Sequence, residues 1–379
     1  MELKTPASFS RSFYALSRAL ARAFPTPVLL APPAAGIDIS DASIKWLLLK
    51  PAPTGLRVVS YGEEALEDGV VVSGIVKDVA ALGDALHEVK KKIGGIHFAH
   101  AALPEEAAYV FEMHVPEGTS REQTLRLIEF EFEARVPITP EAAVFDFDVI
   151  ERHDTGAGEE IGVAVFPREL AESYVSAFNA AGITLLSLEL EARSIARAIS
   201  SPDVADPITL LVDFGRARSG FAVLKNGIPI FTSTVEVGGD SINRALKEKL
   251  SLSFEDAIVF RNTQGLVPEE GAQSAGLDAV AGVASALSDE ITRHYHYWDT
   301  RRNEHGDRMT PVWRVVVVGG SANLRGLTDY IAGRVQAPSL LGNIWGRVCD
   351  FNTYIPPIDR RTSLQYATAM GLALRSHVV

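Results

Sequence analysis

Two aspartates in this 379-residue chain stand where apolar strands are expected to end, and each is followed by a short turn and a serine. Asp38 precedes Ser43 by five positions, and Asp213, which follows the apolar run 209–212, precedes Ser219 by six. Consecutive backbone N–H groups in such turns can bind phosphate oxygens, and carboxylates hold Mg²⁺ largely through its water shell. The pattern predicts that Asp38 and Asp213 order a magnesium ion beside phosphate groups. A purely structural role, which is common for acid-ended hairpins, is the alternative.

Small residues supply the backbone freedom that a phosphate-binding turn requires. Gly215 allows the chain to reverse in the second turn, and Ser40 stands in the first. A later apolar strand, 314–318, runs into three further small residues, Gly319, Gly320 and Ser321. The spacing fits neither a P-loop nor a dinucleotide fingerprint, so the glycines alone specify no cofactor.

Strand hairpins must position these turns. Three apolar strands, 209–212, 221–224 and 228–237, are predicted as a meander, because Asn226-Gly227 is a strong hairpin signal. The third strand is closed by Gly238 and Gly239. The stretch 36–49 has the same order of strand, acid, turn, hydroxyl and strand. We therefore expect an internal repeat.

Two further stretches interrupt or follow this repeat. The block 101–181 is predicted as β-β-α-β-β-α, a compact α+β unit, and a helix is predicted over 188–199. Thr119 to Glu122 resembles a capping box that opens a helix within the block. The block either only braces the main domain or forms a groove for a partner peptide.

Several motifs, in their order along the chain, resemble the PilM family of type IV pilus assembly proteins, within the actin-like ATPase superfamily. They are GIDISDASIK at Gly36, LPEEAAYVFEMHVP at Leu103, EFEARVPITPE at Glu131, VDFGRARSGFAVLKNG at Val212, VEVGGDSINRAL at Val235, VVVGGSANLRGLTDYI at Val316 and ATAMGLALR at Ala367. The resemblance implies an α/β, actin-like two-domain (ribonuclease-H-like) ATPase fold with an inserted α+β subdomain. Its implied domains are 35–206, with 101–181 as the insertion, and 207–361, followed by a C-terminal helix at 362–379 that returns to the first domain.

The resemblance also implies an ATP and Mg²⁺ site in an interdomain cleft. The two turns would grip the phosphates from opposite domains, the late glycine pair would let the backbone approach the adenosine, and Glu191 would orient the attacking water. The implied cofactor-binding residues are Asp38, Ser40, Ser43, Asp213, Gly215, Ser219, Gly238, Gly239, Arg261, Gly319, Gly320 and Ser321, with Asp38 and Asp213 also at the metal.

The chain departs from the family pattern at four positions. The family usually has glycine at Ser40, threonine at Ser219, and a glutamate and a lysine at Ile258 and Arg261, where they reach the ribose and base. Loss of a buried polar contact costs about 1–3 kcal/mol. We therefore expect nucleotide binding with weak or absent ATPase activity.

The resemblance implies a cytoplasmic scaffold, peripheral at the inner face of the cell membrane, that holds the cytoplasmic N-terminal peptide of a PilN-like bitopic protein and can form homo-oligomers. Alternatives with the same fold are a sugar-kinase-like phosphotransferase and a type II secretion relative. A kinase needs a base aimed at an acceptor hydroxyl, and no matching acid-rich motif occurs in 101–181.

Composition narrows the classes further. A net charge of −12 argues against nucleic-acid binding, and the single cysteine excludes an internal disulfide framework. The N-terminal region is basic: residues 1–24 carry Lys4, Arg11, Arg18 and Arg22 against Glu2, and a Pro-rich linker follows to residue 34. Apolar residues at helical spacing over 9–24 predict an amphipathic helix, which either docks on its own protein or contacts an anionic membrane surface.

Overall fold

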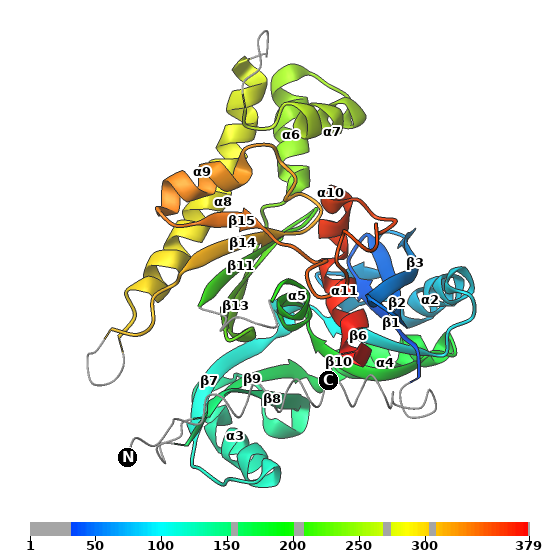
Figure 1. Ribbon diagram of the computed structural model, residues 1–379, viewed down its shortest axis with the longest axis vertical. Coiled ribbons are helices and arrows are strands. Elements are labelled where there is room, and N and C mark those ends of the chain that lie inside the picture. Colours follow the sequence, from blue (N-terminus) through cyan, green and yellow to red (C-terminus); the bar gives the residue numbers. More distant parts are fainter. Residues whose placement is uncertain (1–31, 153–157, 201–207, 268–273, 303–307, 378–379) are drawn as a thin grey trace.

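The computed structural model describes residues 32–152, 158–200, 208–267, 274–302 and 308–377, which form two five-stranded sheets with helices packed around them (Figure 1). The predicted amphipathic segment at 9–24 and the linker up to residue 31 lie outside the described residues. Within those ranges, no helix combines the length and the apolarity that a bilayer crossing requires.

The first sheet has the strand order β10-β6-β1-β2-β3. The strands β1, β2 and β3 form an antiparallel meander. The strand β6 pairs in parallel with β1, and β10 pairs in parallel with β6. The strands are β1 (Ala34–Ile39), β2 (Ser43–Ala52), β3 (Gly55–Ala65), β6 (Phe98–Leu103) and β10 (Thr184–Leu190). A small hairpin and two helices accompany them: β4 (Val71–Val72), β5 (Ile75–Val76), α2 (Val79–Ile93) and α4 (Arg168–Ala180).

The second sheet has the order β13-β12-β11-β14-β15. Again a meander comes first and two parallel strands follow. The strands are β11 (Thr209–Phe214), β12 (Ser219–Lys225), β13 (Ile228–Val235), β14 (Arg314–Val318) and β15 (Ser339–Leu341). The helices of this half are α6 (Gly239–Leu250), α7 (Phe254–Thr263), α8 (Ser274–Asp299) and α9 (Leu327–Val335). The matching strand order of the two sheets supports the predicted internal repeat.

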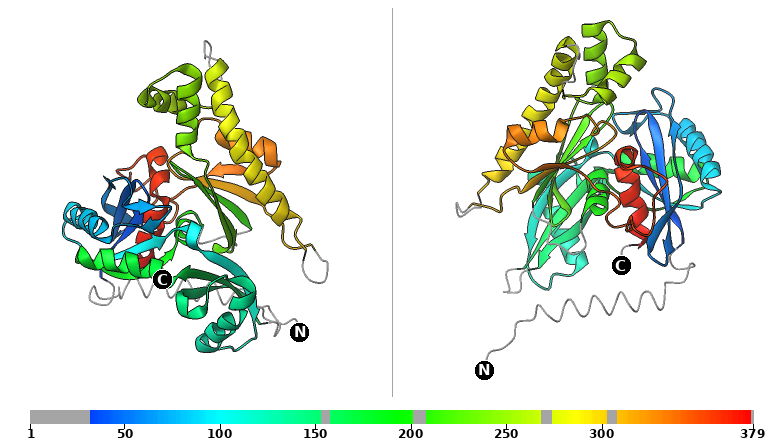
Figure 2. Two further views of the ribbon diagram at one scale, coloured as in Figure 1. Left: turned by 180° about the vertical axis from the view of Figure 1, so that it is seen from behind. Right: turned by 45° about the horizontal axis from the view of Figure 1, so that its top comes forward.

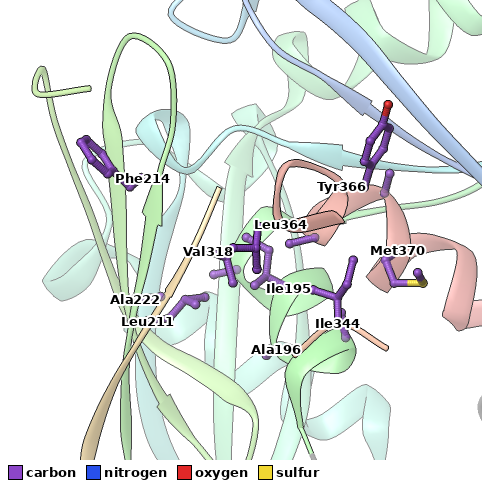
Figure 3. Close-up of a cluster of buried hydrophobic side chains, with 14 of the residues drawn as sticks. Ile195, Ala196, Leu211, Phe214, Ala222, Val318, Ile344, Leu364, Tyr366 and Met370 are labelled. Carbon is purple, nitrogen blue, oxygen red and sulfur yellow. The ribbon is translucent and has the colours of Figure 1, made fainter. Parts of the chain in front are cut away.

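One hydrophobic core joins the two halves. Its central part is α5 (Glu191–Ile199), which lies between the second sheet and the C-terminal elements (Figure 3). The C-terminal elements are α10 (Arg360–Ser363), η3 (Leu364–Tyr366), α11 (Ala367–Leu374) and η4 (Arg375–His377). The approach of α11 is close enough to require glycine on both sides: a Cβ on Gly36 of β1 would lie 2.0 Å from the Ala369 carbonyl oxygen, and one on Gly371 would lie 1.7 Å from that of Ser194.

A three-stranded sheet with its own core projects from the first half (Figure 2). It is built from β7 (Tyr109–Val115), α3 (Arg121–Arg135), η2 (Pro140–Ala142), β8 (Ala143–Arg152) and β9 (Glu159–Pro167), and the short helix η1 (Glu105–Ala107) leads into it. We call residues 109–167 the inserted unit. It is narrower than the expected block 101–181, because β6 pairs within the first sheet and α4 buries Tyr174 and Phe178 in the main core.

The N-terminal ends of two helices differ from the predicted positions. Helix α3 is capped by Ser120, with Gln123 completing the capping box, one position later than the predicted Thr119 and Glu122. Helix α5 begins at Glu191 rather than at residue 188, because β10 continues its parallel pairing with β6 as far as Leu190.

Ion pairs attach the inserted unit to the second half of the chain. Lys225, at the end of β12, pairs with the buried Glu160 at 2.6 Å, and Arg301 pairs with Glu112 at 2.5 Å. The amide of Asn226 donates to the Ile150 carbonyl at 3.3 Å. The unit is thus held by the second half of the chain as well as by the segments that lead into and out of it.

Candidate functional site

The two predicted aspartates occupy equivalent positions near the ends of β1 and β11. Burial, followed by the charge of Asp38, raises the pKa of Asp213 to about 7, whereas Lys45 opposes the rise. Burial likewise raises the pKa of Asp38. Asp213 also borders the late glycine pair, since a Cβ on Gly319 would lie 2.3 Å from Asp213 Oδ1. The fold therefore brings both aspartates and Gly319 to one place.

Two glutamates complete this acidic group. Burial raises the pKa of Glu191 well above its ordinary value, and the neighbouring Glu105 and Asp38 raise it further. Glu105 was not singled out from the sequence. It is buried, and burial, followed by the charge of Asp213, raises its pKa well above the ordinary value. A Cβ on Gly220, the cross-strand partner of Asp213, would lie 2.4 Å from Glu105 Oε2. We call the four acids and the turns 38–43 and 213–219 the two-turn site.

The first turn is closed by serine hydroxyls. Ser40 Oγ donates to the Ser43 carbonyl at 3.0 Å and accepts from the Ser43 N–H at 3.2 Å. Lys45 donates to Ser43 Oγ at 3.0 Å and lowers the pKa of Asp38. Sequence reasoning missed Lys45, although alternation along a strand places it on the same face as Ser43. The site therefore contains a cation beside the first turn.

The second turn is held by contacts on both sides of it. Ser219 is buried, and its hydroxyl donates to the Val237 carbonyl at 2.5 Å. The Gly215 carbonyl accepts the N–H of Gly239 at 3.1 Å, and the Arg216 guanidinium pairs with Asp240 at 3.1 Å. This turn is thereby fixed to the start of α6.

The remaining predicted residues gather beyond the second turn. A Cβ on Gly239 would lie 2.2 Å from Ser321 Oγ and 2.4 Å from Arg261 Nη1, so these three residues meet. A Cβ on Gly238 would lie 2.4 Å from the Arg216 carbonyl oxygen. Gly320 stands apart, facing Gln365 at 3.5 Å from such a Cβ. Backbone can approach a ligand closely at these glycines.

The donor set suits a hydrated magnesium ion better than a directly ligated metal. No three acidic, histidine or cysteine side chains within the described ranges converge closely enough to hold a metal ion. Magnesium keeps several of its waters and takes phosphate oxygens as ligands, and Asp38 and Asp213 are near enough for the charge of Asp38 to raise the pKa of Asp213. Mg²⁺ with a nucleotide phosphate therefore fits the residues that are present.

An open apolar pocket of about 550 Å³ lies at the other end of β1. It is lined by Pro32, Pro33, Leu48 and residues 93–98. Asp38 is near the opposite end of the strand, so this pocket is separate from the two-turn site.

Comparison with known proteins gives concordant matches. Residues 36–377 match the protein family described as Type IV pilus assembly protein PilM. The chain is 23% identical to the cell division protein FtsA of Enterococcus hirae over 330 residues, which is 78% of this chain and 74% of the relative.

Solved structures show the same architecture. A chain titled PilM-PilN type IV pilus biogenesis complex aligns with a TM-score of 0.75 and 19% identity, covering 92% of this chain and 100% of the other. MreB5 of Spiroplasma citri bound to ADP aligns with a TM-score of 0.53 and 13% identity, covering 89% and 94%. These likenesses confirm the predicted actin-like α/β fold.

Proposed function

Because this chain belongs to the PilM family of type IV pilus assembly proteins, we propose that it is an assembly scaffold that binds Mg-ATP in the two-turn site and holds the cytoplasmic tail of a PilN-like membrane protein. The pilus-assembly role itself follows from the family. The ligand, the tail and a position at the inner face of the membrane are our proposals.

The convergence of Asp38, Asp213 and Gly319 carries the nucleotide proposal. The turn amides and Lys45 would hold phosphate oxygens, the two aspartates would orient the water shell of Mg²⁺, and Gly239, Ser321 and Arg261 would lie beside the nucleoside. Bound Mg²⁺ supplies positive charge to the phosphates. Burial of four acids is unfavourable while they are ionised, so a bound cation would relieve their repulsion.

We expect slow hydrolysis. Glu191 is the candidate for orienting water, but burial and the neighbouring acids raise its pKa, which favours the protonated form that cannot accept a proton. Both arginines of the second turn are occupied: Arg216 by Asp240, and Arg218 by Asp41 and Glu106. We expect the isolated protein to hydrolyse less than about one ATP per second, which is slower than the turnover of ordinary enzymes.

A thermal titration tests the nucleotide site. Mg-ATP that binds the folded chain alone should raise the melting temperature progressively, because binding shifts the unfolding equilibrium. Asp38→Ala should remove most of the rise, whereas Asp84→Ala, at an exposed acid on α2, should keep it. No rise in the wild-type protein at millimolar Mg-ATP would refute the nucleotide proposal.

The inserted unit supports the partner proposal. Its helix α3 exposes Phe130 at 83% and Leu127 at 37%, one turn apart on the same face. Exposed apolar side chains that adjoin one another are typical of interaction surfaces. The related structure is titled as a PilM-PilN complex, so we propose that the tail of a PilN-like protein contacts this unit.

A synthetic peptide with the cytoplasmic N-terminal sequence of the organism's own PilN-like protein tests this contact. Phe130→Ser should weaken peptide binding about tenfold or more, as expected for a hot-spot aromatic residue. Ile355→Ser is the matched control, since Ile355 is 84% exposed outside the inserted unit. Equal affinity of the Phe130 variant and the wild type would place the tail elsewhere.

A further inference from the structure

Arg218 spans the two-turn site from one half of the molecule to the other. It lies in the turn between β11 and β12, and its guanidinium pairs with Glu106 of η1 at 2.5 Å and with Asp41 of the first turn. All three side chains are about one-quarter exposed, so solvent screens the pairs only partly. One arginine thus connects both turns with the segment that leads into the inserted unit.

One of the two acceptors of Arg218, Asp41, also accepts hydrogen bonds from the backbone of the β4–β5 hairpin. The donors are the N–H groups of Ser73 at 3.1 Å and Gly74 at 3.0 Å. Gly74 in turn packs against Pro104, the residue before η1, since a Cβ on Gly74 would lie 2.3 Å from Pro104 Cβ. The loop at 73–74 therefore contacts both Asp41 and the residue that precedes η1.

The segment that Arg218 grips is short and directly connected. Glu105 of η1 packs against Gly220 and receives a backbone hydrogen bond from Ala192, next to Glu191. The strand β7 starts at Tyr109, only three residues after Glu106, and it is an outer strand of the inserted sheet. A change in the second turn can therefore reach β7 through a few residues.

We infer that the pairing of Arg218 with Glu106 couples nucleotide occupancy of the two-turn site to the inserted unit. Phosphate bound between the turns fixes the second turn, Arg218 then fixes η1, and β7 becomes more ordered. This inference rests on the proposed nucleotide site, and it adds a regulatory link between that site and the unit proposed to hold the partner.

An arginine outside the two-turn site provides a contrast. Arg334 of α9 pairs with Asp289 of α8, within the second half. A substitution at Arg334 removes one positive charge and one ion pair, as one at Arg218 does, but it leaves both turns and the connection to Glu106 intact. Arg334→Ala is therefore a control for Arg218→Ala.

Amide hydrogen exchange on the full chain, with and without saturating Mg-ATP, tests the coupling. In the wild type, Mg-ATP should slow exchange in residues 213–219 and also, about fivefold or more, in β7, within the range of ordinary allosteric coupling. Glu106→Gln and Arg218→Ala should keep the protection of 213–219 and lose that of β7. Arg334→Ala should keep both.

The outcomes separate the two proposals. If 213–219 is protected but β7 is not in the wild type, or if β7 stays protected in both Glu106→Gln and Arg218→Ala, the coupling is wrong and the nucleotide site stands. If Mg-ATP protects neither region in the wild type, the nucleotide site fails and the coupling fails with it. Glu106→Gln keeps the Arg218–Asp41 pair, so it tests the link even if Arg218→Ala impairs folding.

Discussion

The first and second sheets share one strand order but use their strand-end turns differently. In the first turn the serine hydroxyls bond within the turn, through Ser40 and Ser43, and Asp41 accepts the arginine of the other turn. The second turn is longer by one residue and reaches outward, through Arg216 to α6 and through Arg218 to the other half. The second turn therefore supplies the arginine that connects the halves, and the first turn supplies its acceptor.

The difference shows what a repeat does and does not specify. Because the two meanders have the same backbone path, Asp38 near the end of β1 and Asp213 near the end of β11 occupy equivalent positions. The side chains after each acid are not repeated, and neither are the inserted unit and the returning helix α11, which both belong to the first half. Function that depends on asymmetry therefore resides in these additions.

The largest expected effect breaks the packing of α11 on the first half. Gly371→Ala would place a methyl group 1.7 Å from the Ser194 carbonyl oxygen, so α11 must move away from α5. We expect a loss of about 3 kcal/mol or more of unfolding free energy, because a backbone atom cannot yield as a side chain can. Chemical denaturation measures this loss.

Gly333→Ala is the control for that substitution. Gly333 lies in α9, beside the second sheet, and a Cβ there would meet nothing within 4 Å. Alanine favours helix over glycine by about 1 kcal/mol, so this variant should be neutral or more stable. Equal losses in the two variants would contradict the close approach of α11.

A smaller effect distinguishes the two turns by their cations. Lys45→Met removes the cation beside the first turn, and we expect Mg-ATP affinity to fall by about ten- to a hundredfold, as for loss of a charged hydrogen bond. Calorimetric titration measures it. Lys50→Met, at an exposed position further along β2, should leave affinity within twofold, and a similar fall in both variants would mean that Lys45 acts only through net charge.

The smallest expected effect concerns pH. The folded chain keeps a proton on Asp213 up to about pH 7, whereas an ordinary aspartate releases it near 3.8. The folded state thus binds more protons between these values, so stability should fall as pH rises from about 4 to 8. Asp213→Asn should raise the melting temperature at pH 8 by roughly 1–2 °C, which corresponds to about 1 kcal/mol in a chain of this length.

The same variant separates stability from binding. At pH 4 the gain from Asp213→Asn should vanish, because the wild-type side chain is then protonated as well. The variant should also lose the stabilisation by Mg-ATP that the wild type gains. A melting temperature of the variant at pH 8 that equals or falls below that of the wild type would show that Asp213 is not strained by burial.

Short-range signals in the chain were sufficient for the hairpins and for the places of the strands, although β11 and β12 extend one to two residues beyond the predicted ends. Asn226-Gly227 predicted a tight turn, and the structure has positive φ at both residues. The positions of Asp38 and Asp213 followed from apolar runs that end in an acid. Such features depend on a few neighbouring residues, so they are readable without the fold.

The tertiary structure decided which distant groups meet. Glu105 lies near the other acids because the end of β6 is next to Gly220 of β12 in the folded chain. Arg218 contacts Asp41, which is 177 positions away in the sequence. The limits of the inserted unit were equally unreadable, because β6 and α4 differ from their neighbours in packing partners and not in local pattern. Long-range pairing depends on how two halves dock, and no local periodicity records that.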